Sequence, residues 1–281
     1  KKSLRVETEV KQVLRKDKSK IKRIVHISDI HIRKDSRERF DEYSKVFNNL
    51  ERELKKLNLS RDNSLIVITG DICDSDHCMK KGHELLYKLY SMLIKFCDVL
   101  SIPGNHDISS SYDCSIEPII LNIQGKNNNF FLSNRGEYLY ANLVFGYTPI
   151  DQSVYKIKNS NKKLIKLGLY HGAVESKNSP HFLDQEGNLL LEDFEKEYSY
   201  TLFGDIHKTL YFDKSHYCGS LVQNRHLEDF KKGFVVLDLD TFERTFIKVD
   251  NDYGFLKLEI EEDGKVYVLN GLDEIKEKDK R

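Results

Sequence analysis

The sequence predicts an α/β domain in which two β-sheets pack face to face and helices cover their outer surfaces. Its first hundred residues repeat a unit of apolar strand, polar loop and amphipathic helix, which is typical of a largely parallel sheet. After residue 130 the pattern changes to short apolar runs separated by turns, which indicates further strands, many of them antiparallel. The 281 residues are enough for one such domain with a sizeable core.

The first half is expected to contain three strands and two helices. Apolar residues at three- and four-residue spacing mark the helices, and continuous β-branched and aliphatic runs mark the strands. In order, these elements are a strand at 21–28, a helix at 37–57, a strand at 64–70, a helix at 82–96 and a strand at 99–103.

The second half is expected to be rich in strands, at 130–132, 138–147, 164–170, 200–203, 209–212, 233–240 and 245–249. Near the end, alternation of apolar and polar residues predicts a hairpin with its turn at Asp263-Gly264. The expected organisation is a charged lead-in at 1–20, one domain at 21–250, and a C-terminal β-hairpin with a charged tail at 251–281.

Composition narrows the classes of function. Lys and Arg total 45, as do Asp and Glu, so the formal net charge is zero and any attraction to nucleic acid must come from local patches. The five cysteines are scattered without Cys-x-x-Cys pairs, which argues against a disulfide scaffold or zinc knuckle and indicates a reducing, intracellular setting, cytoplasmic or nuclear. We expect neither membrane attachment nor a signal peptide, because no apolar run approaches the roughly 20 residues that span a bilayer.

Five short polar segments recur down the chain, each after an apolar run. They are Asp29-Ile30-His31, Gly70-Asp71-Ile72-Cys73-Asp74, Gly104-Asn105-His106-Asp107, His171-Gly172 and Gly204-Asp205-Ile206-His207. Because ligand groups of α/β sheets gather at the carboxyl ends of strands, we expect these segments to meet. Together they supply the metal ligands and proton donor that hydrolysis of a phosphate ester requires, although each segment alone is a weak signal.

The residue types indicate separate roles. Asp29 and His31 are two positions apart and project from the same side of the strand end, as the start of one metal site. Asp71 is predicted to bridge two ions, because the two oxygens of one carboxylate can each contact a cation. Asn105 offers a neutral oxygen ligand, and His106 beside it can act on the substrate as general acid or transition-state stabiliser.

Two further acids are expected to support the site rather than bind metal. Asp107 would orient His106 or stabilise its positive charge, and Asp74 would brace the loop on which Asp74 itself lies. Two ions about 3.5–4 Å apart would then activate a bridging hydroxide for in-line attack on phosphorus.

The ordered motifs resemble the signature of the calcineurin-like metallophosphoesterase family. Segments 190–208 (LLEDFEKEYSYTLFGDIHK) and 217–239 (YCGSLVQNRHLEDFKKGFVVLDL) look like the closing blocks of the SbcD-type nucleases of DNA double-strand-break repair. The resemblance covers about residues 21–250. It implies a four-layer αββα sandwich of two mixed sheets flanked by helices.

The resemblance also implies a set of metal ligands. One ion would be held by Asp29, His31, Asp71 and His207, and the other by Asp71, Asn105, His171 and Asp205. Asp205 departs from the family, whose Gly-His-x-His motif has a histidine there. A carboxylate lowers the charge of the cluster by one unit, which favours Mn²⁺, with Mg²⁺ as the alternative, over Zn²⁺. The competing interpretation is a weakened second site and poor catalysis.

Members of this nuclease group are exonucleases and endonucleases that act in DNA repair and recombination with an SbcC-like coiled-coil ATPase. The resemblance therefore implies DNA and such an ATPase as partners, while exonuclease or endonuclease action and pairing into a homodimer are left open. Arg33 and Ser220 are expected to contact substrate phosphates. The alternatives are a phosphodiesterase or phosphatase for a small nucleotide, and a catalytically weak scaffold for the ATPase.

In this group the nuclease domain usually continues into a DNA-capping segment and an ATPase-binding helical segment. The roughly 30 residues after Asp250 are too few for both. The chain is therefore expected to be either truncated or a minimal member.

Overall fold

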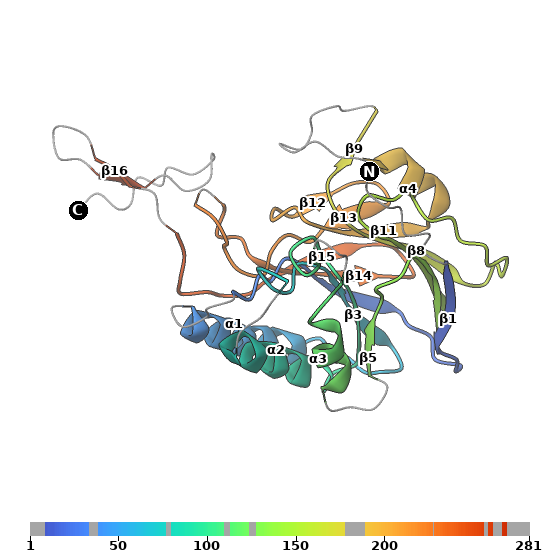
Figure 1. Ribbon diagram of the computed structural model, residues 1–281, viewed down its shortest axis with the longest axis horizontal. Helices are drawn as coiled ribbons and strands as arrows, with labels where there is room; N and C mark the ends of the chain where they lie inside the picture. The colour runs from blue at the N-terminus through green and yellow to red at the C-terminus, as the bar shows by residue number, and fades with distance from the viewer. Residues whose placement is uncertain are drawn as a thin grey trace.

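The computed structural model describes residues 9–33, 39–76, 80–109, 113–123, 128–177, 189–226 and 228–255, and the backbone of short strands at 258–260 and 266–268. It confirms the predicted sandwich of two large mixed sheets, with helices on both outer faces (Figure 1). The four layers are three helices, a six-stranded sheet, a seven-stranded sheet and one further helix.

The six-stranded sheet carries the first three motifs. Its order is β15 (Arg244–Lys248), β14 (Gly233–Asp238), β2 (Arg23–Ile27), β3 (Ser64–Thr69), β4 (Asp98–Ile102) and β5 (Asn129–Phe131). Strands β2 to β5 are parallel neighbours, whereas β14 and β15 run antiparallel along one side. The carboxyl ends of β2, β3 and β4 therefore lie together, as the sequence predicts.

The seven-stranded sheet carries the last two motifs. Its order is β1 (Val10–Arg15), β6 (Gly136–Tyr140), β7 (Leu143–Thr148), β8 (Ile165–His171), β11 (Tyr200–Gly204), β13 (Ser215–Tyr217) and β12 (Leu210–Tyr211). Four of its six neighbouring pairs are parallel and two are antiparallel. Together with the antiparallel pairs of β14 with β2 and β15, these two confirm antiparallel strands after residue 130. Long connections before β8 and β11 return the chain to the same end of the sheet, which parallel pairing requires.

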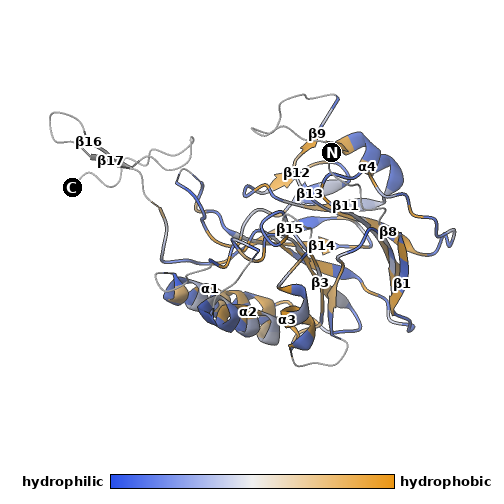
Figure 2. Ribbon diagram, viewed as in Figure 1, coloured by the Kyte–Doolittle hydropathy of each residue, from blue (hydrophilic) through white to orange (hydrophobic). Residues whose placement is uncertain are grey.

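Helices α1 (Phe40–Lys55), α2 (Lys80–Leu93) and α3 (Glu117–Asn122) lie on the outer face of the six-stranded sheet (Figure 1). Helix α4 (Leu191–Glu197) covers the other sheet, preceded by the short parallel pair β9 (Val174–Glu175) and β10 (Leu189–Leu190). Hydrophilic and hydrophobic residues alternate along α1 and α2, as expected for helices with one face on a sheet (Figure 2).

Strand alternation divides the apolar residues between layers. On β3, Ile66 and Ile68 pack against the helices, whereas Leu65 and Val67 point between the two sheets. Phe194 of α4 is fully buried in a third cluster on the outer face of the seven-stranded sheet. The parallel central strands are thus buried on both faces, which fixes the strand ends that carry the polar motifs.

The expected chain ends are partly revised. Val10–Arg15 pairs with β6 as an edge strand, so this part of the charged lead-in belongs to the sheet. At the other end β16 (Leu258–Ile260) pairs antiparallel with β17 (Val266–Val268), whereas the predicted turn at 263–264 lies outside the described residues.

The cysteines follow the expectation in part. Cys97, Cys114 and Cys218 are free, but Cys73 beneath the site is disulfide-bonded, contrary to a fully reduced set. Within the described residues, no helix is both long and apolar enough to cross a membrane.

Candidate metal centre

The five polar segments converge at one edge of the sandwich. Asp29 follows β2, Asp71 follows β3, and Asn105 follows β4 on the six-stranded sheet. His171 ends β8, and His207 lies three residues beyond β11 on the other sheet. Both sheets thus contribute side chains to a single centre.

Four non-glycine residues of these segments adopt left-handed backbone conformations. The φ angles are 52° at Asp29, 51° at His31, 48° at Asp71 and 95° at Asp205. Such angles are uncommon for residues with a side chain and cost of order 1–3 kcal/mol each. Backbone hydrogen bonds hold the turns, with His31 N–H donating to the carbonyl of Asp71 at 2.9 Å. The sharp turns aim these side chains from the strand ends into the centre.

Two glycines let the loops approach closely enough. A Cβ at Gly104 would lie 2.1 Å from Asp71 Oδ1 and 2.3 Å from Asp71 N. A Cβ at Gly204 would lie 2.0 Å from the Thr69 carbonyl and 2.6 Å from His171 Nδ1. A Cβ does not fit at either position, so both residues must be glycine.

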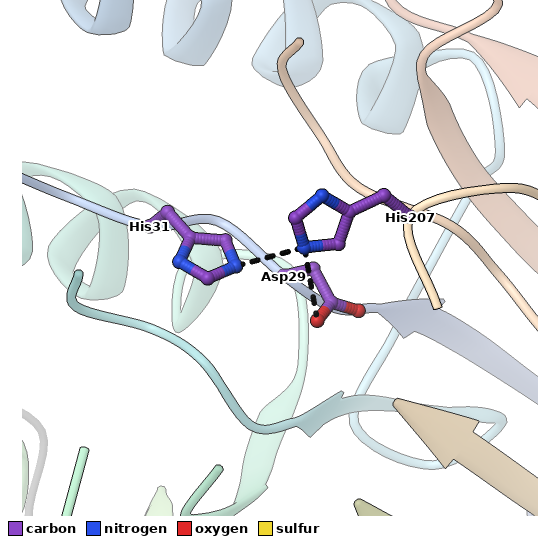
Figure 3. Close-up of side chains that lie close together, drawn as sticks. All are labelled: Asp29, His31 and His207. Carbon is purple, nitrogen blue, oxygen red and sulfur yellow. Dashed lines mark hydrogen bonds and ion pairs between the residues drawn. The ribbon is translucent and has the colours of Figure 1, made fainter. Parts of the chain in front are cut away.

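The first cluster consists of Asp29, His31 and His207 (Figure 3). His31 Nε2 and His207 Nε2 lie 3.0 Å apart, and His207 Nε2 lies 3.9 Å from Asp29 Oδ1. Asp29 and His31 are buried, whereas the His207 side chain is 14% exposed. The three ligand atoms thus surround one point near the surface.

Asp71 lies between this cluster and a second one. Its Oδ2 is 3.4 Å from His31 Nε2, and its Oδ1 is 3.3 Å from His171 Nε2. His171 Nε2 also lies 3.0 Å from Asn105 Oδ1. Asp29, Asp71 and His171 form a group with metal-ligand spacing, so Asp29 also reaches both halves of the centre. Asp71 thus turns one oxygen toward each half of the centre, as a carboxylate that bridges two ions must.

Hydrogen bonds on the outer nitrogens fix the histidine tautomers. His171 Nδ1 donates to the carbonyl of Thr69 at 2.7 Å, and His207 Nδ1 donates to Glu228 Oε1 at 2.7 Å. Because these two partners accept and do not donate, the neutral rings of His171 and His207 each turn an Nε2 lone pair inward. His31 Nδ1 makes a looser contact, 3.3 Å from Asp74 Oδ1. Facing lone pairs and carboxylates repel one another unless cations lie between them, so the residues fit divalent metal ions.

In the absence of metal, protons take the place of the cations. Burial alone would lower the pKa of His171, but the carboxylates of Asp71, Asp29 and Asp205 outweigh burial and raise it to about 10. Burial favours the neutral form of Asp71, yet His171 and His31 hold its pKa well below the usual range. Metal binding must therefore displace a proton from His171.

His106 lies where a substrate can reach it. Its side chain is 35% exposed, and its Nε2 is 4.0 Å from Asp71 Oδ2. His106 Nδ1 donates to the backbone carbonyl of Asp74 at 3.0 Å, and the backbone N–H of His106 donates to Asp71 Oδ1. His106 thus presents Nε2 to the open side of the centre.

Asp107 does not orient the His106 ring as predicted. Its buried carboxylate instead accepts the backbone N–H groups of Ile72, Cys73 and Gly104 at 2.8–3.1 Å. Burial and the nearby Asp71 raise the pKa of Asp107 to about 6. Asp107 therefore fixes the two loops that carry Asp71 and His106, and the ring orientation comes from a backbone carbonyl.

Asp205 has a different place from the other predicted ligands. Besides the two groups above, His31, Asp74 and His106 also have metal-ligand spacing, and among the described residues none of the three groups includes Asp205. Its backbone N–H donates to Asp29 Oδ1 at 3.1 Å. Burial raises the pKa of its carboxyl, and the carboxylates of Asp29 and Asp71 add to this against the opposing effect of His171. A ligand role for Asp205 stays a prediction.

The two predicted substrate contacts differ. Arg33 Nη2 donates to the carbonyl of Asn224 at 3.3 Å, and Arg33 is half-buried beside the centre. Ser220 is 1% exposed, and its hydroxyl donates to the carbonyl of Val222 and accepts from Lys232 Nζ. The backbone N–H of Ser220, the group expected to reach a phosphate, donates to the carbonyl of His207 at 3.2 Å. Ser220 thus supports the loop that carries His207, and its contact with substrate stays a prediction.

Sequence reasoning missed Glu228, which lies 2.7 Å from His207 Nδ1. Burial favours the neutral acid, but His207 and Lys232 lower the pKa of Glu228 to about 2. Burial likewise opposes protonation of His207, yet Glu228 and Asp29 raise its pKa. The only signal in the sequence was the spacing of Glu228 and Lys232, four residues apart beyond the last motif.

A family model described as calcineurin-like phosphoesterase matches residues 22–239. Uncharacterized protein R555 of Acanthamoeba polyphaga mimivirus is 36% identical over an alignment of 265 positions that covers 86% of this chain. The chain spans only 19% of the length of that relative.

Two solved structures show weak similarity to the chain. Pseudomonas putida nuclease MPE is 14% identical, with 54% of this chain and 62% of that chain covered and a TM-score of 0.30. A cold-active protein-tyrosine phosphatase of a Shewanella species is 12% identical, with 82% and 81% covered and a TM-score of 0.38. Neither score is high enough to support a comparison of function.

Proposed function

Because the chain belongs to the calcineurin-like phosphoesterase family, we propose that it is a two-metal phosphodiesterase that cleaves DNA. The observation that carries the phosphodiesterase proposal is the position of Asp71, whose two carboxylate oxygens face His31 and His171 at 3.4 and 3.3 Å. The lone pairs that converge around this carboxylate favour two cations over one.

The family uses divalent metals, which when bound would activate water and neutralise charge on the phosphate. Asp29, His31 and His207 would hold one ion, and His171 with Asn105 would help to hold the other. Asp71 lies between the two sets and keeps them at a fixed separation.

His106 is proposed as the group that acts on the leaving oxygen. Its Nδ1–H is committed to the Asp74 carbonyl, so a second proton on the ring resides on Nε2, which faces the open side. The imidazolium delivers this proton to the departing oxygen or stabilises its charge, which typically contributes 10²- to 10⁴-fold in rate. The Asp74 carbonyl keeps the ring in the orientation that this transfer needs.

DNA as substrate rests on the sequence resemblance of segments 190–208 and 217–239 to SbcD-type nucleases. Arg33, whose Nη2 donates to the carbonyl of Asn224, is proposed to contact a phosphate of the bound strand. The same resemblance leads us to propose an SbcC-like coiled-coil ATPase as partner and Mn²⁺ as the working metal. Asp205, as an additional carboxylate near the centre, favours the harder Mn²⁺ over Zn²⁺.

The test is hydrolysis of end-labelled single- and double-stranded DNA and of bis-p-nitrophenyl phosphate in Mn²⁺, Mg²⁺ and Zn²⁺. We expect Mn²⁺-dependent DNA cleavage that His106→Gln lowers by about 10²-fold or more. His83 lies exposed on α2, so His83→Gln serves as a matched control that keeps the wild-type rate.

The outcomes separate the competing functions. Cleavage of the small ester but of no DNA would replace the nuclease proposal with a phosphodiesterase for a small nucleotide. Metal binding without hydrolysis of either substrate would favour a scaffold role. The labelled products would also distinguish removal of end nucleotides from internal cuts.

A further inference from the structure

Glu228 is an acid outside the predicted motifs whose carboxylate is engaged on both oxygens. Its Oε1 accepts His207 Nδ1–H at 2.7 Å. Its Oε2 accepts the backbone N–H of Asn224 at 3.0 Å and Lys232 Nζ at 2.9 Å. With a side chain that is 14% exposed, Glu228 lies behind His207 and away from the cluster of inward nitrogens. It is therefore placed to hold the ring and not to bind a metal ion itself.

We propose that Glu228 is a positioning residue that fixes the tautomer and orientation of His207 for metal binding. This inference rests on the proposed two-metal function. A carboxylate that accepts the Nδ1–H of histidine leaves the lone pair on Nε2 and makes that nitrogen a better donor to a metal. In this chain His207 Nε2 faces the cluster, at 3.9 Å from Asp29 Oδ1 and 3.0 Å from His31 Nε2.

Lys232 makes the arrangement rigid. Its side chain is 4% exposed, and its ammonium group donates to Glu228 Oε2, to Ser220 Oγ and to the backbone carbonyl of His207. One cation thus ties the carboxylate behind the ring to the backbone that carries the ring. The backbone carbonyl of Glu228 also accepts Gln223 Nε2–H at 2.7 Å, which anchors the loop from the other side.

The second histidine of this cluster is held less firmly. His31 Nδ1 lies 3.3 Å from Asp74 Oδ1, and the Asp74 side chain is 42% exposed, so water can replace it. The Glu228 contact to His207 is shorter and more enclosed. Loss of Glu228 should therefore affect the ion at Asp29, His31 and His207 more than the ion at Asp71, Asn105 and His171.

The experiment is calorimetric titration of Mn²⁺ into the metal-free protein. Wild type should bind two ions, and Glu228→Ala should weaken one of them by about 10- to 100-fold, as is typical when the acceptor behind a histidine ligand is removed. Glu228→Gln keeps one of the two acceptor oxygens, so it can accept either from His207 Nδ1 or from Lys232 and Asn224 but not from both sides, and it should lose an amount of affinity between wild type and Glu228→Ala. Glu192, which accepts hydrogen bonds from Ser176 and Lys177 away from the centre, provides the matched control Glu192→Ala.

A double variant distinguishes action through His207 from a general loss of structure. If Glu228 acts only through the His207 ring, removing Glu228 should have no further effect once the ring is gone. The affinity for the remaining Mn²⁺ ion should then be equal in His207→Ala and in the His207→Ala/Glu228→Ala double variant. Nitrogen NMR of the metal-free protein, at a pH where the ring is neutral, should show His207 protonated on Nδ1 in wild type and mixed tautomers in Glu228→Ala.

Each failure has its own meaning. Wild-type affinity for both ions in Glu228→Ala, together with loss of an ion in His207→Ala, would overturn the role of Glu228 and leave the two-metal function standing. A wild-type protein that binds no Mn²⁺ would instead overturn the proposed function. Equal losses in Glu228→Ala and Glu192→Ala would show a structural effect and also overturn the inference.

Discussion

Gly104→Ala is a small change that should disable the centre while most of the fold stays intact. A Cβ at this position would lie 2.1 Å from Asp71 Oδ1 and 2.3 Å from Asp71 N. Real Cβ contacts are essentially never closer than 3.0 Å, so the Asp71 carboxylate must move by about 0.9 Å and the backbone of one of the two loops by about 0.7 Å. Metal-ligand distances tolerate about 0.2 Å, and a displacement near 1 Å can cost 10²-fold in rate.

We therefore expect Gly104→Ala to lower Mn²⁺ affinity and hydrolysis of bis-p-nitrophenyl phosphate by about 10²-fold each. Overpacking at a buried position should also cost roughly 1–3 kcal/mol of unfolding free energy. The measurements are calorimetric Mn²⁺ titration, initial rates at saturating metal, and urea denaturation of the metal-free protein.

Gly136→Ala is the matched control, since its added Cβ would lie 2.1 Å from the carbonyl of Val10 in the edge strand β1. It should lose a similar amount of stability and keep wild-type Mn²⁺ affinity. Wild-type metal binding and rate in Gly104→Ala would show that the Asp71 loop tolerates the added Cβ and would contradict this prediction, as would equal losses of metal affinity in both variants.

Three further predictions concern protons, loop support and metal choice. Because the metal-free fold raises the pKa of His171 to about 10, Mn²⁺ must displace the proton of His171. The apparent affinity for Mn²⁺ should therefore rise with pH from about 6.5 to 10, by up to about tenfold per pH unit for one proton. An affinity that does not change with pH in calorimetric titrations would contradict this. Asp107→Ala leaves three buried N–H groups without their acceptor and should cost about 3 kcal/mol or more in urea denaturation, with a smaller loss in Asp107→Asn; a loss under about 1 kcal/mol would disprove the clamp. Asp205→His should shift preference from Mn²⁺ toward Zn²⁺ in competition titrations, and unchanged Mn²⁺ affinity and rate would rule out Asp205 as a ligand.

Much of the fold could be predicted because the buried parallel strands consist of long apolar runs. The predicted strand at 64–70 agrees almost to the residue with β3, Ser64–Thr69. Every residue of β3 is buried and its alternate side chains face two different layers, which requires a continuous apolar run. Strand β13 and helix α4 were missed because each is short and has weak periodicity. The predicted run at 138–147 proved to be two strands, which turn at Ala141 with a φ of 50° that its sequence does not signal.

Convergence of the site could be predicted because each motif follows a strand, and parallel strands bring their carboxyl ends to one edge. The detailed roles could not be derived in the same way. Asp107 is adjacent to His106 in sequence, yet its side chain points to the loop backbone, since neighbouring residues at a turn need not face the same group. Glu228 lies 21 residues beyond His207, and only the tertiary fold brings it within 2.7 Å.

Anomalous diffraction from crystals of the protein soaked in Mn²⁺ would locate the metal ions directly. We expect two manganese peaks about 3.5–4 Å apart with the Asp71 carboxylate between them, one beside His31 and His207 and the other beside His171. A single peak, or two peaks of which only one contacts Asp71, would contradict a two-metal centre bridged by Asp71.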